Sequence, residues 1–347
     1  MAFPGVGEGD RPAALMTTLG RRLRARLRLM RHSPPLRMPS TLRALGILGM
    51  NERNGDYIGI YNDRRHYPLV DDKLKTKELA LAAGIATPEL YGVVEIEHQV
   101  RELDRILDGR REFVIKPAQG SGGNGIMVIA DRRGVNFLRA SGASVTRSEL
   151  EHFISNALSG MYSLGGLPDK AIIEYRVKPH AVFDAVSYQG VPDIRTIVFR
   201  GVPVASMVRL PTRQSDGKAN LHQGAIGAGI DLASGRTVDG VWFNNVLDAH
   251  PDSGNRVRGI QVPDWDELLT LAARSYDLTR LGYLGVDVVL DRDHGPLVLE
   301  YNARPGLNIQ LANQMGLLSR LKQIRALAQV PDDAAARVAL GQQLFGG

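Results

Sequence analysis

The sequence predicts an α/β protein, and three features of the chain from about residue 51 onward support this fold class. Short runs rich in valine and isoleucine, typical of buried strands, alternate with segments of helical periodicity. Two pairs of such runs, 113–117 with 125–130 and 194–201 with 203–210, are joined through glycine, as in antiparallel hairpins. The long amphipathic segment 264–281 predicts a helix with one buried face. The 347 residues are enough for two or three domains.

Each element follows from the spacing of its apolar residues and from the glycines and prolines that end it. The first helix after the N-terminal region, for example, ends at Gly84, and Pro88 follows. The predicted strands are 57–62, 91–96, 113–117, 125–130, 171–177, 194–201, 203–210, 285–291 and a last one within 296–306. The predicted helices are 73–83, 98–107, 148–160 and 264–281, the tail 317–344 is expected to be helical, and a polar loop is expected at 211–225.

The composition excludes several classes of protein. There is no cysteine, which excludes disulfides, thiolate metal sites and cysteine nucleophiles. No run of about 18 apolar residues predicts a transmembrane helix. The N-terminus also lacks the apolar core of a secretory signal. These observations favour a cytoplasmic protein.

The positive charge of the chain is local. The formal net charge is +6, but nine arginines lie from Arg11 to Arg43, a stretch without any acidic residue. Subtracting these nine charges from +6 leaves −3 for the remainder. The bulk of the protein is therefore not a basic nucleic-acid binder. Because no motif of a nucleic-acid-binding fold is present either, no nucleic-acid partner is predicted.

Residues 14–31 predict a basic amphipathic helix. Four leucines and a methionine recur at spacings of three and four and share one face, and arginines take much of the rest. Two interpretations remain open. The helix could lie on an anionic membrane surface or bind a membrane protein, so that the protein is peripheral at the inner membrane face. It could equally pack on its own domain, with a solvated basic face.

A glycine-rich loop, Gly120 to Gly125, follows Lys116 between two predicted strands. Backbone N–H groups of such a loop can approach phosphate oxygens closely. The loop matches neither the Walker pattern nor the dinucleotide fingerprint, because a strand and not a helix follows it. A plain hairpin loop remains an alternative. Lys116 favours phosphate, because a lysine on an apolar strand is costly to bury unless it pairs with an anion.

Two predicted strands toward the end of the sheet carry oxygen ligands. Asp287 lies on the first, and Glu300 and Asn302 lie on the second. Since residues i and i+2 of a strand point to the same face, Glu300 and Asn302 project together. Two carboxylates and an amide oxygen form a hard ligand set that suits Mg²⁺. The alternative is that the carboxylates form ion pairs with arginines such as Arg304.

A third group of residues is basic. By the same period of two, Asp193 and Arg195 share a strand face, and Arg209 lies on the partner strand. Arginines aimed at a phosphate stabilise the charge that develops during its transfer. The following loop adds Lys218, Asn220 and His222. Each of these taken alone could also be a solvated surface residue.

Taken in order, these motifs resemble the ATP-grasp superfamily. Within it, the chain is similar to the RimK-type α-L-glutamate ligases, or to the sugar-transfer-associated ATP-grasp group. The resemblance covers about residues 70–310, and the ordered set is specific for the fold and for ATP use but much less so for the substrate. The matching stretches are Asp72-Lys73-Leu74, Val114-Ile115-Lys116-Pro117, Ile173-Glu174-Tyr175, Asp193-Ile194-Arg195, Asn220-Leu221-His222-Gln223-Gly224 and Glu300-Tyr301-Asn302-Ala303-Arg304-Pro305-Gly306.

The resemblance implies an ATP-grasp fold, in which two α+β subdomains clamp ATP, and an ADP-forming carboxylate–amine ligase that works through an acyl-phosphate. Arg195 and Arg209 would be catalytic, facing the transferred phosphoryl group. Asp287, Glu300 and Asn302 would hold two Mg²⁺ ions, for which Mn²⁺ could substitute. The residues implied to bind ATP are Lys73, Lys116, Gly120, Ser121, Gly122, Gly123, Glu174, Tyr175, Arg176, Val177, Asp193, Lys218, Asn220 and His222. Those from Glu174 to Val177 would read adenine through their backbone.

The family's usual domain before the first lysine is shortened here, because only 72 residues precede Lys73. The expected segments are a flexible tail with the basic helix (1–45), a truncated pre-grasp region (46–110), a small lobe with the glycine loop (111–180), a large lobe with the metal site (181–316) and a helical tail (317–347). Since the missing region helps to bind substrate in the family, the substrate is the least determined feature.

Three functions therefore remain open. The first is a glutamate-ligase-like enzyme that adds an amino acid to an amino acid, a peptide or a protein terminus. The second is an ATP-grasp enzyme that modifies a glycan or a cell-envelope precursor at the membrane surface. The third is a non-catalytic ATP-binding regulatory module. The sequence allows an oligomer in each case.

Overall fold

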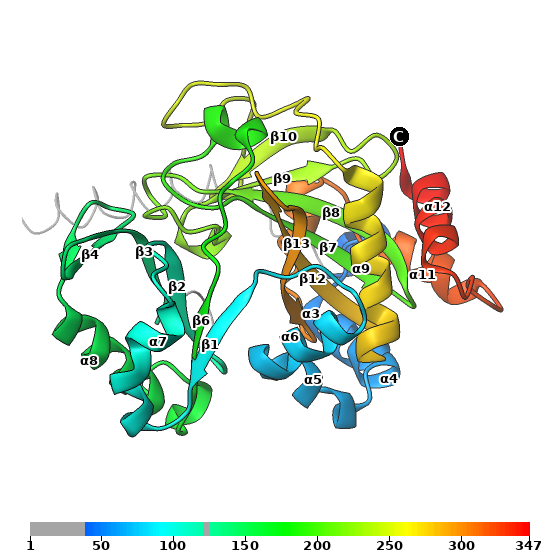
Figure 1. The fold of residues 1–347 in the computed structure, drawn as a ribbon. Helices are drawn as coiled ribbons and strands as arrows, with labels where there is room; N and C mark the ends of the chain where they lie inside the picture. The colour runs from blue at the N-terminus through cyan, green and yellow to red at the C-terminus, as the bar shows by residue number, and fades with distance from the viewer. Residues whose placement is uncertain (1–38, 121–124) are drawn as a thin grey trace, which may run out of the picture. The chain divides into compact units, whose positions relative to one another are not determined.

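The computed structural model describes residues 39–120 and 125–347 (Figure 1). Helix α2 (Pro39–Ala44) lies outside the compact unit that Leu45–Gly347 form. The predicted basic helix at 14–31 and positions 121–124 of the glycine loop lie outside the described residues. None of the helices in the described part of the chain has the length and apolar character that crossing a membrane needs.

The compact unit contains two antiparallel sheets. The first has the strand order β1-β6-β2-β3-β4-β5 and the second the order β11-β10-β9-β8-β7-β12-β13. The strands of the first sheet are β1 (Leu90–Val94), β2 (Phe113–Pro117), β3 (Met127–Arg133), β4 (Asn136–Arg139), β5 (Ser144–Val145) and β6 (Ala171–Glu174). Those of the second are β7 (Asp193–Phe199), β8 (Val202–Leu210), β9 (Ile226–Ile230), β10 (Thr237–Trp242), β11 (Asn245–Leu247), β12 (Tyr283–Asp291) and β13 (Gly295–Asn302).

Helices complete two α+β lobes, as the sequence predicts. The α-helices of the compact unit are α3 (Met50–Glu52), α4 (Gly59–Tyr61), α5 (Pro68–Asp71), α6 (Lys73–Ala82), α7 (Leu103–Leu107), α8 (Arg147–Leu158), α9 (Trp265–Thr279), α10 (Ile309–Ala312), α11 (Leu318–Ala326) and α12 (Ala334–Phe345). Short helices of other types are η1 (Arg53–Ile58), η2 (Arg64–His66), η3 (Glu97–Glu102), η4 (Leu164–Gly166), η5 (Ala181–Val186) and η6 (Leu221–Gln223).

Both predicted hairpins are confirmed. β2 pairs with β3, and β7 pairs with β8, in antiparallel registers. The predicted limits of the lobes remain a prediction, but the first sheet also includes β1, which precedes the expected start of the small lobe at residue 111. The helix predicted at 98–107 is a 3₁₀ turn, η3, followed by α7.

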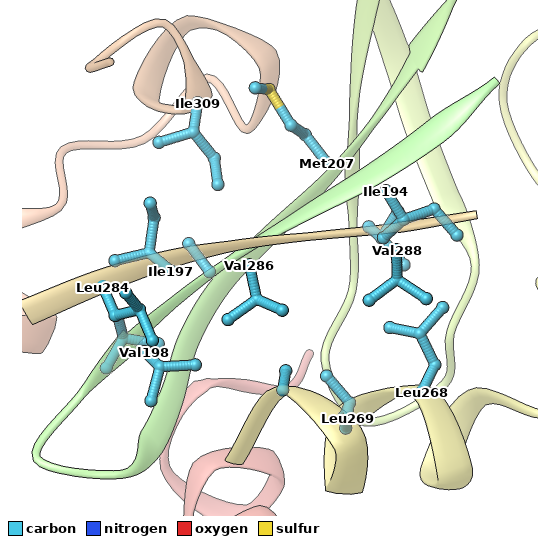
Figure 2. Packing of buried hydrophobic residues seen from close by; sticks show 14 of the residues in the cluster. Ile194, Ile197, Val198, Met207, Leu268, Leu269, Leu284, Val286, Val288 and Ile309 are labelled. Carbon is cyan, nitrogen blue, oxygen red and sulfur yellow. The ribbon is translucent and has the colours of Figure 1, made fainter. Parts of the chain in front are cut away.

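The core of the large sheet explains which of its residues face the candidate site. Val286 and Val288 of β12 point toward Leu268 and Leu269 of α9, all of them buried (Figure 2). Side chains alternate along a strand, so Asp287 between the two valines points to the other face of the sheet. The amphipathic helix predicted at 264–281 is thus the element that fixes the direction of this carboxylate.

The strand predicted at 57–62 is wrong. The segment is helical, a π-type turn η1 followed by α4. Its buried residues Arg53, Tyr57 and Ile58 recur at a helical spacing and not at a spacing of two. Tyr57 packs its ring edge against Phe199, with ring centroids 5.4 Å apart. The tyrosines and isoleucines of this segment, which are typical of strands, are here explained by burial against the large sheet.

The tail predicted to be helical at 317–344 forms two helices, α11 and α12. Pro331 lies between them and cannot continue a helix. The side chain of Asp333 then accepts a hydrogen bond from Ala336 N at 2.9 Å and caps the start of α12.

Candidate functional site

One face of the large sheet collects the acidic and basic residues that the sequence singles out. Asp287 of β12 lies opposite Glu300 of β13 on one side and opposite Arg195 of β7 on the other. Asp193 of β7 lies opposite Arg209 of β8. By the alternation of side chains, these residues share the face away from α9.

Four of these residues form a buried ion network, which we call the arginine network: Asp193, Arg195, Arg209 and Asp287. Arg195 donates to both oxygens of Asp287, from Nε at 2.7 Å and from Nη2 at 2.5 Å. Arg209 donates from Nη2 to Asp287 at 2.8 Å and to Asp193 at 2.7 Å. Two cations and two anions are therefore matched within the protein itself.

The two carboxylates of the network respond differently to burial. Burial raises the pKa of Asp193, although the guanidinium of Arg209 opposes the shift. Burial also acts to raise the pKa of Asp287, but Arg195 and Arg209 outweigh it and hold that pKa below its usual range. The alternative of arginine pairing thus applies to Asp287, with Arg195 and Arg209 as partners. Arg304 instead stacks on the Tyr67 ring, 5.3 Å from its centroid.

Glu300 and Asn302 complete the predicted ligand set. Glu300 is half-buried, and within the described residues its side chain forms no hydrogen bond or ion pair. Asn302 lies opposite Gly285, where a Cβ would come close to Pro305 and Asn302. Asn302 donates weakly from Nδ2 to Asp287 at 3.3 Å, which leaves its amide oxygen available.

These three residues fit Mg²⁺ by the chemistry of their donors, because carboxylate and amide oxygens are its usual protein ligands. Among the described residues, no group of three or more histidine, cysteine, aspartate or glutamate side chains could hold a metal ion. A site with two carboxylates and one amide would therefore depend on phosphate oxygens for its remaining ligands. The oxygens of Asp287 would also have to exchange an arginine for the ion.

A second charged group joins α6 to the first sheet. We call it the lysine cluster, and it consists of Lys73, Lys77, Lys116 and Glu174. Lys116 of β2 forms an ion pair with Oε1 of Glu174 at the end of β6. Val114 lies opposite Glu174 and Lys116 lies opposite Ile172, so the two charged residues are diagonal neighbours on one face. Lys116 thus has the anionic partner that its burial requires, and that partner lies within the protein.

Lys73 connects the lysine cluster to the glycine loop. It begins α6, which Asp72 caps by accepting from Leu74 N and Lys75 N. Its Nζ donates to Gly120 O at the base of the loop. Burial lowers the pKa of Lys73, while Glu300 of the large lobe acts in the opposite direction. This electrostatic interaction links the cluster to the carboxylates of the large sheet.

Gly120 is sterically constrained to be glycine, because a Cβ there would collide with the Pro117 ring. The residue also bridges to Ser163 in an antiparallel pairing. Ser121, Gly122 and Gly123, to which the resemblance assigns phosphate contacts, lie outside the described residues.

The hinge after β6 runs directly onto the large sheet. Tyr175 N donates to Glu89 O at 2.8 Å, and Val177 packs against Val289 and Leu297. Asp291, at the end of β12, accepts from Lys178 N at 2.7 Å. The backbone from Glu174 to Val177 is therefore fixed at both ends. Arg176 points elsewhere and pairs with Glu112 at 3.1 Å.

The loop after β8 is not joined to the charged groups in this structure. Lys218 and His222 are exposed, and Asn220 caps η6 by accepting from His222 N at 3.0 Å. Within the described residues, no hydrogen bond or ion pair links these three side chains to the arginine network or to the lysine cluster. Their assignment to nucleotide binding remains a prediction.

Two residues of the site were missed from the sequence. Lys77 of α6 lies 2.8 Å from Glu174, and its position four residues after Lys73 on a predicted helix could have revealed it. Asp291 anchors the hinge through the backbone of Lys178, Asp293 and His294. No short-range pattern in the sequence indicates that contact.

The profile of the family described as sugar-transfer associated ATP-grasp matches residues 52–326. A probable alpha-L-glutamate ligase of Maridesulfovibrio salexigens is 26% identical over 259 residues. That match takes in 74% of this chain and 63% of the relative, so the chain spans less than two thirds of the relative's length.

Two solved structures are similar at low identity. The RimK domain protein ATP-grasp from Sphaerobacter thermophilus is 12% identical, with a TM-score of 0.43, 76% of this chain covered and 70% of that chain. The ATP-grasp ligase PsnB, complexed with a minimal precursor, is 14% identical, with a TM-score of 0.42 and coverages of 80% and 62%.

Proposed function

Because the chain belongs to the sugar-transfer-associated ATP-grasp family, we propose that it is an ADP-forming ligase that joins a carboxylate to an amine. The observation that carries the proposal is the face of the large sheet where Asp287, Glu300 and Asn302 lie beside Arg195 and Arg209. A carboxylate is unreactive toward an amine. Transfer of the γ-phosphoryl group of ATP turns it into an acyl-phosphate, which the amine attacks as phosphate leaves.

In this proposal the small lobe binds the nucleotide. Lys73 and Lys116 contact the phosphates, and the glycine loop that begins at Gly120 closes over them. The backbone from Glu174 to Val177, fixed at both ends, reads the adenine. Binding and orientation of the two reacting groups supply much of the rate, so no protein nucleophile is required.

In this proposal, residues of the large lobe neutralise the negative charge of the phosphates. Asp287, Glu300 and Asn302 would hold Mg²⁺, as two ions in the family's arrangement and with Mn²⁺ as a substitute, and the metal would neutralise phosphate charge. Arg195 and Arg209 would stabilise the charge that develops on the transferred phosphoryl group. Lys218, Asn220 and His222 would approach when the loop after β8 closes over substrate and excludes water.

The substrate is proposed by class. The relative from Maridesulfovibrio is named for glutamate ligation. We therefore expect an amino acid, a peptide or a protein terminus as one partner, in a cytoplasmic reaction.

The direct test incubates the protein with Mg·ATP and a panel of amino acids and peptides, measures ADP and phosphate, and identifies products by mass. The proposal requires ADP release that depends on a particular amine, and a product mass equal to both partners less one water. Release of AMP and pyrophosphate would contradict it. Tight binding of Mg·ATP without turnover in any amine pool would instead favour a regulatory module.

Glu300→Gln serves as the inactive control for this assay, because it should lose turnover without losing stability. Its side chain forms no ion pair in the described residues, so the nucleotide-free variant should unfold within about 0.5 kcal/mol of the wild type. Turnover should nevertheless be lost, because the neutral amide of glutamine lacks the negative charge with which a carboxylate holds Mg²⁺. A large loss of stability in the absence of nucleotide would assign Glu300 a structural role.

A second candidate function follows from the family's description, which names sugar transfer. The same chemistry could act on a glycan or cell-envelope precursor at the membrane surface, with residues 14–31 as the contact. Co-sedimentation with anionic lipid vesicles that is lost on deletion of residues 1–45 would favour it. Turnover with peptides and no vesicle binding would favour the first candidate.

A further inference from the structure

Helix α6 presents a second lysine, Lys77, to the end of β6 in the first sheet. Lys77 follows Lys73 by four residues, so the two side chains lie one above the other on the same side of the helix. The Nζ of Lys77 lies 2.8 Å from Oε2 of Glu174 and donates to Pro88 O. Lys73, one turn earlier, donates to Gly120 O. A single helix therefore contacts both the start of the hinge and the base of the glycine loop.

Glu174 is shared between two lysines. Lys116 contacts Oε1 and Lys77 contacts Oε2. The exposed fractions of these side chains are 10% for Lys116, 6% for Lys77 and 5% for Glu174. Oε2 has no partner that satisfies hydrogen-bond geometry among the described residues, so its interaction with Lys77 is chiefly Coulombic.

The lysine cluster carries more positive than negative charge. Three lysines against one glutamate leave a formal excess of two positive charges. Outside the cluster, Glu300 and Asp169 also act on Lys73, and the Asp169 carboxylate accepts hydrogen bonds from Gln119 N, Lys170 N and the Ser163 hydroxyl. Burial lowers the pKa of Lys77 and of Lys73, as expected for cations that lack full compensation. Such a group favours a polyvalent anion.

The shared carboxylate of Glu174 explains which lysine keeps the excess positive charge. With Lys116 as its only partner, Glu174 would neutralise that lysine and hold its ammonium group at the hinge. Because Lys77 occupies the other oxygen, the charge of Lys116 is not fully neutralised and remains available to an anion. On the basis of the proposed function, we propose that Lys77 is a positioning residue: it shares Glu174 with Lys116 and so keeps Lys116 available to the phosphates of ATP.

Isothermal titration with a non-hydrolysable ATP analogue and with adenosine tests this proposal. Lys77→Met keeps the length of the side chain and removes its charge. We expect it to weaken binding of the ATP analogue about tenfold, equivalent to about 1.4 kcal/mol. Adenosine, which lacks phosphates, should bind within about threefold of the wild type. Lys75→Met, on the exposed side of the same helix, is the matched control and should change neither affinity.

The double variant Lys77→Met with Glu174→Gln separates positioning from packing. Removing both charges frees Lys116 again, so the affinity for the ATP analogue should return to within about threefold of the wild type. If Lys77→Met alone does not fold, the comparison of the double variant with Glu174→Gln decides. Without the carboxylate, loss of Lys77 should cost the ATP analogue less than about threefold in affinity.

Three results would overturn the proposal. The first is an unchanged affinity of Lys77→Met for the ATP analogue, and the second is an equal loss for the analogue and for adenosine. The third is a tenfold loss on adding Lys77→Met to Glu174→Gln. Failure of the wild type to bind the ATP analogue would refute the proposed function itself, and the role of Lys77 with it.

Discussion

The arginine network and the lysine cluster differ in how completely their positive and negative charges are paired. In the arginine network, two arginines and two aspartates are matched and buried. In the lysine cluster, Lys77 and Lys116 share the carboxylate of Glu174, and Lys73 donates to a backbone carbonyl. Burial costs free energy for every uncompensated charge. Under the proposed function, the lysine cluster would be prepared for an anion in the free protein, whereas the arginine network would have to open before a metal ion or a phosphoryl group could enter.

The largest effect is expected from breaking the matched network. Arg209→Met leaves Asp193 buried without its cation, and loss of one partner of a buried pair typically costs about 3–5 kcal/mol. Urea unfolding measures the loss. Adding Asp193→Asn should recover part of the stability, because the buried charge is then removed. A loss below about 1 kcal/mol in the single variant would show that the network is not energetically matched.

Lys116→Met is the variant of the lysine cluster that corresponds to Arg209→Met in the arginine network. It removes one cation from a group with excess positive charge and leaves Glu174 paired with Lys77. We expect the nucleotide-free protein to lose less than about 1 kcal/mol in the same urea experiment. A loss as large as that of Arg209→Met would contradict the contrast between the two groups.

Ligands should distinguish the two groups as well. Inorganic tripolyphosphate without metal should stabilise the protein through the lysine cluster, by about 2.7 kcal/mol at a hundred times its Kd. Mg²⁺ alone should stabilise the protein much less, because the carboxylate oxygens of Asp287 already accept hydrogen bonds from two arginines. Thermal unfolding with each ligand, and with both, measures this. Equal stabilisation by Mg²⁺ alone would show that the network opens at little cost.

A smaller effect is expected with pH. Burial acts to raise the pKa of Glu174, but Lys116 and Lys77 outweigh it and lower that pKa. Stability from this carboxylate is therefore fully present above its unfolded pKa of about 4.3 and is lost as the pH falls through the lower folded pKa. Urea unfolding at several acidic pH values should show this decline. Glu174→Gln should make the decline shallower, and an unchanged slope would contradict the assignment.

The elements of the fold that depend on local patterns were predictable from the sequence. The two hairpins, the helix at α6 and the common face of Glu300 and Asn302 follow from periods of two and of about four. The segment at 57–62 was predicted wrongly because its aromatic and branched residues are buried by contacts with the distant Phe199 and Tyr283. Local β propensity therefore gave way to tertiary packing.

The partners of the charged residues could not be read in the same way. The pairing of Asp287 with Arg195 and Arg209 depends on the order β8-β7-β12 in the sheet, and that order joins residues 78 to 92 positions apart. The spacing of Lys77 from Lys73 shows that the two share a helix face, but the contact of Lys77 with Glu174 requires α6 to lie near the end of β6. Sequence patterns give the face of a residue, whereas the sheet topology decides which charges meet there.

The smallest effect should come from an exposed ion pair of the small lobe. Lys170 Nζ lies 2.5 Å from Glu95 Oε1, the same distance that separates Arg195 Nη2 from Asp287. The exposed fractions are 43% and 48% for the first pair but 13% and 3% for the second. Water screens the exposed pair, so Lys170→Ala should change the free energy of unfolding by no more than about 0.5 kcal/mol.

A double-mutant cycle of Lys170→Ala with Glu95→Ala, measured by urea unfolding, isolates this interaction. A coupling free energy above about 2 kcal/mol would show that short distance alone gives an ion pair its strength. A coupling near zero, beside a large loss in Arg209→Met, would instead attribute the difference to burial. The comparison matters for the site, because the same burial that makes the arginine network costly to break leaves the lysine cluster dependent on an incoming anion.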